Sequence, residues 1–236
     1  MNELTHRIED LDWTQITAAL DERGYATAGG LLTAGECADL IALYADERRF
    51  RKRVEMERLR FGAGEYKYFA VPLPDVIQQM RAAFYPRLAP IANRWAAQMR
   101  GAQLFPPTLG GLQELCGRHG QLKPTPLLLR YEAGGYNCLH QDLYGEIAFP
   151  LQITCLLSRP ERDFAGGEFL LVEQRPRAQS RGEAITLEQG EAIIFPNAHR
   201  PVRGTRGHYR VNVRHGVSRI HRGLRFSLGV IFHDAK

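Results

Sequence analysis

Apolar residues in the second half of the chain fall in short runs separated by turn residues. Residues 150–158 form a continuous apolar run, PLQITCLLS, which suits a strand in the interior of a barrel. Residues 224–228 alternate between apolar and polar side chains, which is the period of a half-buried strand. The same reasoning predicts further strands at residues 127–129, 167–172, 184–187, 192–195 and 210–220. Consecutive strands without intervening helices predict a double-sheet jelly roll, or double-stranded β-helix, from residue 125 onward.

Helical spacing dominates the first half. Trp13, Ile16 and Leu20 recur at the period of an amphipathic helix, and residues 33–36 have the form of a capping box that opens a helix to about residue 45. Residues 75–100 are also helical in pattern, although prolines at positions 86 and 90 predict a break into two pieces. A short helix is predicted from the Pro106-Pro107 pair to about residue 119.

No repeat or low-complexity linker divides the chain, which predicts one domain spanning residues 1–236. In this domain a mainly helical N-terminal part, residues 1–124, supports an all-β core, residues 125–236. The expected fold class is therefore α+β overall, with an all-β jelly-roll core.

In residues 47–74, seven basic side chains precede Phe61 and a cluster of glycines and aromatics follows. Basic residues beside aromatics suit a mobile flap that contacts a nucleic-acid backbone and stacks on a base. The alternative is a turn and a β-hairpin whose aromatic side chains pack on the barrel. The two interpretations are compatible.

Composition indicates a globular chain with a substantial core, because 44% of its 236 residues are hydrophobic. No window resembles a signal peptide or a membrane span, and the four cysteines form no Cys-x-x-Cys pair. We therefore expect reduced thiols and a cytoplasmic protein without membrane partners. The oligomeric state is left open.

The net charge is +5, and arginine supplies most of the 31 basic residues. Eight arginines and no carboxylate lie between Phe195 and His233. This block is either an electrostatic footprint for phosphates or a solvated face together with a cofactor clamp.

The chemistry centres on His140-Gln141-Asp142, which follows the predicted strand at residues 127–129. On an extended segment, residues two apart face the same way, so His140 and Asp142 present an imidazole and a carboxylate side by side. These are two thirds of the 2-His-1-carboxylate triad that binds non-haem Fe(II). A bare His-x-Asp is common, and its alternative interpretation is a surface turn.

The third ligand must come from a distant strand, and five histidines follow Asp142. His215 heads a run that also contains Arg225 and Ser227 on one face of a strand, after a turn predicted at Arg222-Gly223. An arginine with a hydroxyl two residues on suits a clamp for a carboxylate. His199 is the rival ligand, since it follows Phe195-Pro196, but no such clamp follows it.

This pattern resembles the Fe(II)/2-oxoglutarate-dependent dioxygenases over residues 127–234. Residues 130–142 are similar to a segment of bacterial alkylation-repair dioxygenases, including a tyrosine nine residues before the first metal histidine. Residues 164–169 and the ten-residue step from His215 to Arg225 resemble prolyl-hydroxylase relatives instead. The repair enzymes place their 2-oxoglutarate arginine further from the histidine, in an asparagine-containing strand that this chain lacks. Taken whole, the chain resembles a bacterial family of 2-oxoglutarate oxygenases associated with oxidative demethylation of damaged DNA.

The resemblance implies Fe(II), 2-oxoglutarate and O₂ as cofactors, with ascorbate as a supporting reductant. It implies that His140, Asp142 and His215 hold the metal. It implies that Arg225, Ser227 and Tyr131 hold 2-oxoglutarate. Tyr136, Asn137 and Gln152 are candidate substrate contacts, because the first two precede His140 and the third is polar within an apolar strand.

Three classes of function follow. The first is a dioxygenase that demethylates alkylated nucleic acid, with single-stranded or damaged DNA as partner. The second is a protein (prolyl-type) or small-molecule hydroxylase, and the third is a non-enzymatic barrel that binds a ligand. The ligand and clamp positions are intact in this sequence, which argues against the third.

Overall fold

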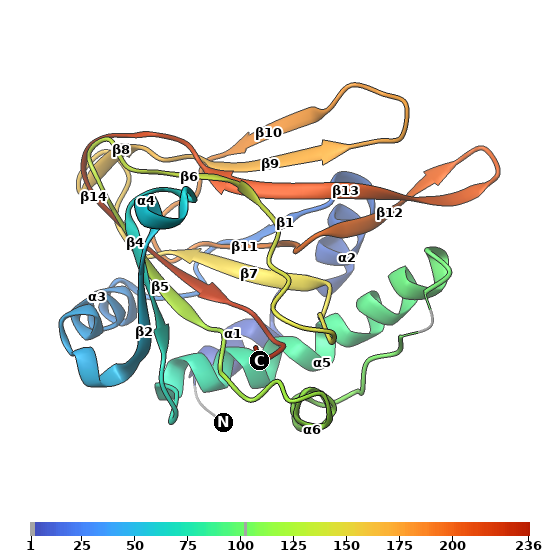
Figure 1. The fold of residues 1–236 in the computed structure, drawn as a ribbon, viewed down its shortest axis with the longest axis horizontal. Helices are drawn as coiled ribbons and strands as arrows, with labels where there is room; N and C mark the ends of the chain where they lie inside the picture. The colour runs from blue at the N-terminus through green and yellow to red at the C-terminus, as the bar shows by residue number, and fades with distance from the viewer. Residues whose placement is uncertain (1–2, 102) are drawn as a thin grey trace.

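Two antiparallel sheets face one another in the computed structural model, and helices cover the outer side of the larger sheet (Figure 1). The structure describes residues 3–101 and 103–236. Within these residues the helices are α1 (Glu3–Glu9), α2 (Trp13–Arg23), α3 (Ala34–Ala42), α4 (Met56–Leu59), α5 (Asp75–Gln98), α6 (Leu109–Arg118) and two short 3-10 turns, η1 (Leu43–Ala45) and η2 (Glu47–Arg49).

The larger sheet has eight strands in the order β1-β11-β7-β14-β5-β4-β2, with β8 paired to β14. Their bounds are β1 (Ala26–Ala28), β2 (Phe50–Glu55), β4 (Glu65–Phe69), β5 (Leu127–Glu132), β7 (Leu151–Leu156), β8 (Phe164–Gly166), β11 (Ala192–Pro196) and β14 (Ile220–Val230). The smaller sheet has six strands in the order β10-β9-β13-β6-β3, with β12 paired to β13. Their bounds are β3 (Gly62–Ala63), β6 (Tyr136–His140), β9 (Phe169–Gln174), β10 (Arg181–Ile185), β12 (His199–Gly204) and β13 (Gly207–Val217).

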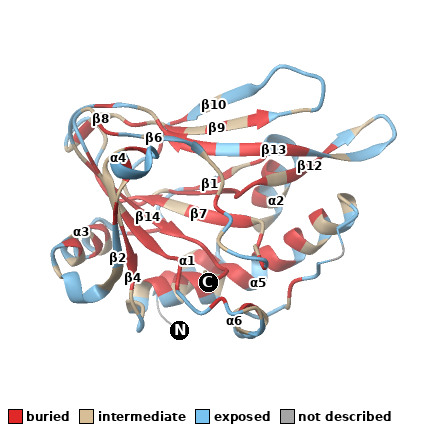
Figure 2. Cartoon of the chain, in the orientation of Figure 1, coloured by how far each residue is buried: buried red, intermediate tan, exposed pale blue. Residues whose placement is uncertain are grey.

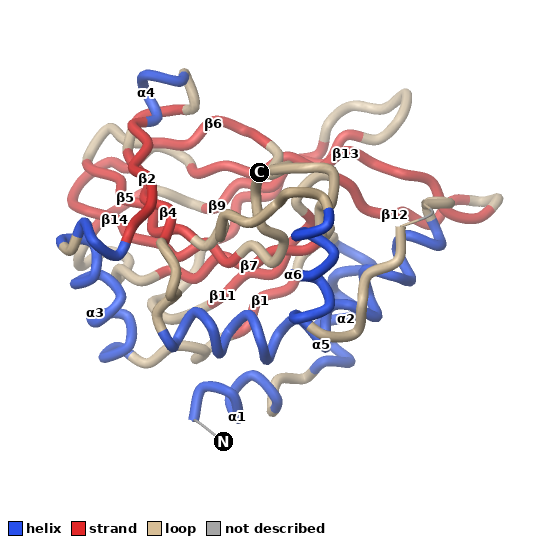
Figure 3. Tube along the Cα trace, turned by 60° about the horizontal axis from the view of Figure 1, so that its bottom comes forward, coloured by secondary structure: helices blue, strands red, loops and turns tan. Residues whose placement is uncertain are grey.

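This arrangement confirms the predicted jelly roll with supporting helices. Apart from the short α4, the helices gather on one side of the strands (Figure 3). The N-terminal part of the chain also contributes strands β1 to β4, which join both sheets. Long-range pairing therefore binds the two halves of the chain together.

Alternation along the central strands separates two main hydrophobic clusters, and a third, smaller cluster lies beside them. On β7, Ile153 and Cys155 face the helices, whereas Leu156 joins the cluster between the sheets. The helix-side core also contains Phe84 and Trp95 of α5. Figure 2 shows the buried central strands between the exposed outer hairpins and the helices. The face of β7 and β14 that is turned toward the smaller sheet is the one that carries polar residues.

Helix α5 runs unbroken through Pro86 and Pro90, so the predicted break into two pieces is wrong. Both prolines are exposed and lie four residues apart, on the solvent side of the helix. The carbonyl groups that lose a donor there can bond to water, while the buried stripe packs on the large sheet. Tertiary packing therefore outweighs the local cost of the prolines.

Residues 47–74 form a hairpin on the barrel, in line with the second of the two interpretations offered above. Strand β2 pairs with β4, and β4 pairs with β5 of the central sheet. Tyr68 and Phe69 are buried, whereas Phe61, in the connection through α4 and β3, is 46% exposed. The aromatic side chains therefore divide between packing and solvent.

The turn predicted at Arg222-Gly223 is absent, because β14 is continuous through these residues. Gly223 has a φ of +79°, and the pairing of β14 with β8 shifts register between Ile220 and Arg222. The glycine thus permits an irregularity within a strand rather than a reversal. The chain reverses earlier, at Ser218-Arg219 between β13 and β14.

All four cysteines are free thiols, and three of them are buried. No helix in the described residues has the length and apolarity needed to cross a bilayer.

His233 lies fully buried near the C-terminus, where its Nδ1 accepts a hydrogen bond of 3.2 Å from the Phe149 amide. Burial lowers the pKa of His233 from about 6.5 to about 4. As the pH falls, His233 is therefore protonated near pH 6.5 in the unfolded chain but only near pH 4 in the folded chain. We expect the preferential protonation of the unfolded chain to lower the free energy of unfolding by roughly 3 kcal/mol as the pH falls from 6.5 to 4. Above pH 6.5 this effect is absent.

The measurement is urea unfolding of wild type and His233→Asn between pH 4 and 7. The variant should show a flatter dependence of unfolding free energy on pH. His208→Asn, at an exposed site, is the control and should follow wild type. Identical pH profiles for wild type and His233→Asn would contradict the assignment.

Candidate metal centre and active-site pocket

A cavity of about 210 Å³ opens between the two sheets, at the end of β6. It is smaller than most pockets for drug-sized ligands, which span about 300–1,000 Å³. Its lining combines aromatic side chains with polar groups from both sheets, and includes Phe61, Tyr66, Leu129, Tyr131, Asn137, His140, Gln141, Asp142, Tyr144, Gln152, Thr154, Phe169, His215 and Ser227.

Three predicted metal ligands meet on the wall of this cavity. His140 ends β6, Asp142 follows it in the loop, and His215 lies opposite His140 in the register of β13. The Nε2 atom of His215 is 3.1 Å from Asp142 Oδ2, and that of His140 is 3.5 Å from Asp142 Oδ1. One ligand atom from each residue lies within 4.8 Å of the others, and no other such group of three occurs in the described residues.

A β-bulge brings Asn137 and His140 to the same face of β6. Asn137 pairs with Val217 and His140 pairs with His215, so β6 advances three residues where β13 advances two. The close contact at this bulge requires Gly216, because a Cβ there would lie 2.6 Å from the carbonyl oxygen of Asn137. Side chains of β6 therefore alternate between the two faces of the sheet on either side of the bulge, but not across it.

His199, the rival ligand, lies elsewhere. It begins β12 and pairs with Asn212 on the hairpin that leads into β13. Burial lowers its pKa, and the charge of Arg210 lowers it further. His199 is absent from the group of potential ligands, so the structure brings His215, and not His199, to His140 and Asp142.

Asp142 is the electrostatic centre of the site. Burial raises its pKa, but the hydrogen bond and charge of His215, together with the charge of His140, hold that pKa well below its usual range. Burial lowers the pKa of His215, and the neighbouring His140 lowers it further. An ionised carboxylate beside a buried imidazole that favours its neutral form suits metal binding, which requires deprotonated ligands.

Tyr144 is a further residue of the site, and sequence reasoning missed it. Its hydroxyl donates a hydrogen bond of 2.6 Å to Asp142 Oδ1, and its ring is packed near Tyr68. Burial and the adjacent Asp142 raise the pKa of Tyr144 well above its usual value, so it stays protonated as a donor. Its position two residues after the carboxylate was the only signal in the sequence.

We expect Tyr144→Phe to weaken metal binding by about 10- to 100-fold, because partners that orient a ligand carboxylate commonly contribute this much. Anaerobic titration with Fe(II) measures the change. Tyr209→Phe, on the exposed hairpin, is the matched control. An Fe(II) affinity for Tyr144→Phe equal to that of wild type would show that the hydroxyl has no orienting role.

Arg225, Ser227 and Tyr131 lie together on neighbouring strands. Arg225 is directly opposite Tyr131 in the register of β14 and β5, and its Nη1 donates a hydrogen bond of 3.1 Å to Ser227 Oγ. The guanidinium is buried, and its Nε has no partner. The Tyr131 hydroxyl is also buried without a partner, and burial raises the pKa of Tyr131 to about 12.

Arg225 lines a smaller cavity of about 70 Å³, whereas Ser227 and Tyr131 line the main one. Phe169 lines both cavities. The polar atoms without partners on Arg225 and Tyr131 are unusual in a folded protein, because a buried donor without an acceptor costs about 1–3 kcal/mol.

The three candidate substrate residues lie in different places. Asn137 and Gln152 line the cavity, and the Gln152 side-chain nitrogen is buried without a partner. Tyr136 points away from the cavity, is 37% exposed, and lies 5.6 Å from the guanidinium of Arg219. Phe61 reaches the cavity from the β2–β4 connection, and only the aromatic character of residues 47–74 hinted at this.

Comparison with known proteins agrees with this geometry. Residues 64–235 match the model of the Oxygenase-NA family, which is described as an oxygenase catalysing oxidative methylation of damaged DNA. "Uncharacterized protein MT2286" of Mycobacterium tuberculosis (strain CDC 1551 / Oshkosh) is 50% identical over 167 residues, which cover 71% of this chain and 72% of the relative. "Uncharacterized protein Rv2227" of strain ATCC 25618 / H37Rv matches to the same extent.

Solved structures share the fold at low sequence identity. A Pseudomonas putida prolyl-4-hydroxylase superposes with a TM-score of 0.54 at 13% identity, over 95% of this chain and 100% of that one. A 2OG-Fe(II) oxygenase family oxidoreductase from Burkholderia pseudomallei gives 0.52 at 16% identity, over 96% of this chain and 93% of that one.

The family match spans most of the chain, and the resemblance to Fe(II)/2-oxoglutarate-dependent dioxygenases drawn from the sequence is confirmed. The chain belongs to the Oxygenase-NA family and is an oxygenase with the fold of the 2-oxoglutarate–Fe(II) enzymes.

Proposed function

We propose that this protein is an Fe(II)- and 2-oxoglutarate-dependent dioxygenase that demethylates alkylated nucleic acid by hydroxylating an N-methyl carbon. The observation that carries the proposal is the convergence of His140, Asp142 and His215 at one cavity between the sheets. The description of the family, which names damaged DNA, supports the substrate class.

The residues fit the metal. Two imidazoles and one carboxylate on one side of a cavity leave coordination positions open for further ligands, as the facial triad of non-haem Fe(II) requires. His140, Asp142 and His215 would therefore hold Fe(II).

The residues also fit a dicarboxylate. Arg225 presents a buried guanidinium whose Nε lacks a partner, Ser227 adds a hydroxyl, and the Tyr131 hydroxyl is free. A carboxylate in the main cavity beside Ser227 and Tyr131 would accept from both hydroxyls and from Nη1 of the arginine, which already lies 3.1 Å from Ser227 Oγ. We assign these three residues to the far carboxylate of 2-oxoglutarate.

Bound Fe(II), with 2-oxoglutarate and O₂, supplies an oxidant that hydroxylates an unactivated C–H bond and releases succinate and CO₂. The chain contributes position and environment. The apolar wall excludes water, and Tyr144 holds the Asp142 carboxylate in one orientation. Gln152 and Asn137 present amide groups to whatever enters the cavity. Hydroxylation of an N-methyl carbon gives a product that loses formaldehyde, so the methyl group is removed.

The size of the cavity favours a large substrate of which only one part enters. About 210 Å³ accommodates a small co-substrate and the reacting end of a second molecule. A nucleobase taken out of its stack is such an end, and enzymes that modify bases read it by stacking on aromatic side chains. Phe61, exposed at 46% and lining the cavity, can serve in this way.

A protein hydroxylase of the prolyl type is the second candidate. The ten-residue step from His215 to Arg225 and the Gly166-Gly167-Glu168 turn favour it. An extended peptide is the expected substrate in that case, and it would not require basic side chains beyond the cavity.

The test is succinate release by purified protein with Fe(II) and 2-oxoglutarate, with and without methylated single-stranded DNA. We expect stimulation by the methylated strand together with formaldehyde in equal amount, and no stimulation by the unmethylated strand. Turnover that is unaffected by methylated DNA but increased by a proline-containing peptide would overturn the nucleic-acid substrate and favour the second candidate.

A further inference from the structure

The eight arginines between Phe195 and His233 separate into two groups in the folded chain. Four of them have a partner within the protein. Arg200 is buried and bonds to Glu173 at 2.7 Å, and Arg222 lies 3.1 Å from Glu161. Arg219 lies over the ring of Tyr136, and Arg225 belongs to the site described above.

The remaining four are Arg203, Arg206, Arg210 and Arg214, which we call the hairpin arginines. All four are exposed, and the structure gives none of their side chains a hydrogen bond or ion pair with a described residue. They lie on the hairpin of β12 and β13, which turns through Thr205 and Arg206. A contiguous set of cations without carboxylate partners is unusual for a solvated face, where opposite charges are normally interspersed.

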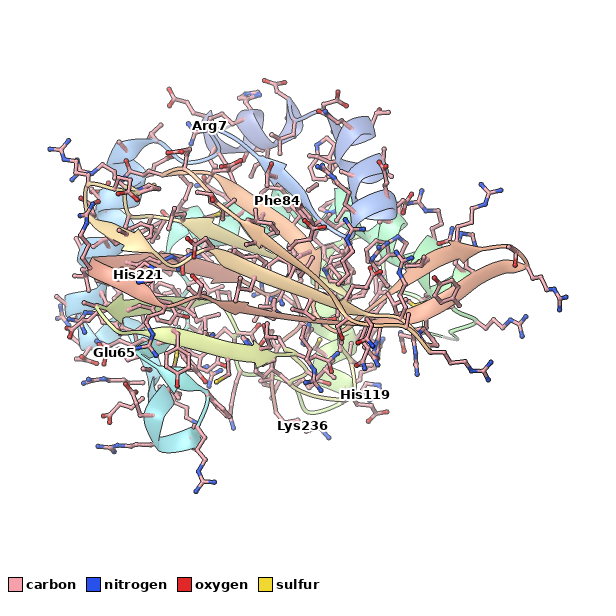
Figure 4. The ribbon with its side chains drawn as sticks, turned by 90° about the horizontal axis from the view of Figure 1, so that it is seen from above. Arg7, Glu65, Phe84, His119, His221 and Lys236 are labelled. Atoms are coloured by element: carbon pink, nitrogen blue, oxygen red, sulfur yellow. The ribbon has the colours of Figure 1, made fainter. Side chains whose placement is uncertain are left out.

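The hairpin extends beyond the body of the molecule. In Figure 1 it projects to the right, beside the β9–β10 hairpin, and Figure 2 shows its end exposed. From above, long nitrogen-ended side chains point outward along it (Figure 4). Such a projection offers a charged surface to a partner rather than to the protein's own core.

The carboxylates near the hairpin leave its charge uncompensated. On β9, Glu173 forms ion pairs with Arg175 and Arg200. On β10, Glu183 accepts a hydrogen bond from Arg181. Arg177, in the loop between these strands, is a further exposed cation without a described partner. The two hairpins therefore form one face of positive potential.

Strand β13 joins the β12–β13 hairpin to the metal centre, with Arg210 and Arg214 on its exposed face and His215 on its buried face. Gln141, between the two ligands His140 and Asp142, donates hydrogen bonds of 2.9 Å to the carbonyls of Ala198 and Val213. The nine residues from Arg206 to His215 span roughly 30 Å of strand, at about 3.4 Å per residue.

We infer that the hairpin arginines bind the phosphate backbone of a single-stranded nucleic acid whose reacting base enters the cavity at His215. This inference rests on the proposed function and names the surface that holds its substrate. Arginine matches phosphate with two parallel hydrogen bonds, and the hairpin supplies such contacts from β12, from its turn and from β13. A single strand is favoured over a duplex because a buried metal can reach only an unpaired base.

The experiment measures binding of an unmodified fluorescent 20-nucleotide single strand to the full chain, by anisotropy at increasing salt and without iron or 2-oxoglutarate. The variant is Arg203→Ala/Arg206→Ala/Arg210→Ala. The control, Arg87→Ala/Arg118→Ala/Arg162→Ala, removes the same charge from exposed sites off the hairpin. Thermal unfolding and substrate-independent 2-oxoglutarate turnover, which the hairpin should not affect, verify that each variant is folded.

We expect the hairpin variant to bind at least tenfold more weakly at 0.1 M salt. Its slope of log affinity against log salt should fall by about 2, since single strands release roughly 0.7 counterion per phosphate contact. The control should keep the affinity and slope of wild type. Equal losses in both variants would show a general effect of net charge and overturn the assignment.

Three other results would also overturn it. These are tighter binding to duplex DNA than to the single strand, tighter binding to polyglutamate or anionic vesicles, and no binding by wild type. Because the assay contains neither metal nor methylated base, its failure is distinct from a failure of the proposed demethylation, which succinate and formaldehyde report.

Discussion

Asp142→Ala should lower Fe(II)-dependent succinate release by more than about 100-fold, because even the loss of a group that merely orients a ligand costs 10- to 100-fold. The substitution removes the one carboxylate that lies between His140 and His215. It also leaves the Tyr144 hydroxyl without its acceptor in a buried position. Anaerobic titration should show that Fe(II) affinity falls in parallel with turnover.

The matched control is Asp46→Ala, which removes a partly exposed carboxylate paired with Arg48, away from the cavity. It should bind Fe(II) and release succinate as wild type does. If Asp142→Ala retained the Fe(II) affinity of wild type, the triad would not be the metal site. Unfolding curves for both variants separate a loss of ligand from a loss of fold.

Arg225→Met should raise the KM for 2-oxoglutarate by about 100-fold, equivalent to roughly 3 kcal/mol for a charge-assisted pair of hydrogen bonds. The same substitution should leave the stability of the ligand-free protein unchanged or raise it. In the protein without ligand, the buried guanidinium has one hydroxyl partner and an Nε with none. Replacing such a charge with an apolar side chain of similar length is commonly neutral or stabilising.

Thermal unfolding tests both halves of this prediction. Added 2-oxoglutarate should raise the melting temperature of metal-loaded wild type, because a ligand that binds only the folded state stabilises it. It should not raise that of Arg225→Met. Ser227→Ala, which removes the hydroxyl partner, should have a smaller effect on KM, about tenfold. An unchanged KM in Arg225→Met would exclude the clamp, and a large fall in melting temperature without ligand would show a structural role.

The sequence alone was enough to predict features that depend only on nearby residues, such as strand alternation and helix capping. The alternation at residues 224–228 correctly placed Arg225 and Ser227 on the inner face, because side-chain direction in a strand repeats every two residues. The capping box at Thr33 and Glu36 is present in the structure with both of its hydrogen bonds. These features need only neighbours in sequence.

Two predictions from residue type were wrong where tertiary packing decides the backbone path. Pro86 and Pro90 predicted a broken helix, yet α5 is continuous because its buried stripe is fixed against the large sheet. Gly223 suggested a turn, yet it permits an irregular strand. In both cases the residue type was interpreted correctly as a local perturbation, and tertiary contacts decided its consequence.

The sequence by itself determined the jelly roll, the supporting helices and the pairing of an imidazole with a carboxylate at His140 and Asp142. It favoured His215 over His199 through the Arg225 and Ser227 clamp, but only the register of β13 against β6 shows that His215 lies beside His140. The sequence could not reveal Tyr144 as a partner of the carboxylate, or separate paired from unpaired arginines. These depend on contacts between residues far apart in the chain or on the path of a loop, and only the packed tertiary structure specifies them.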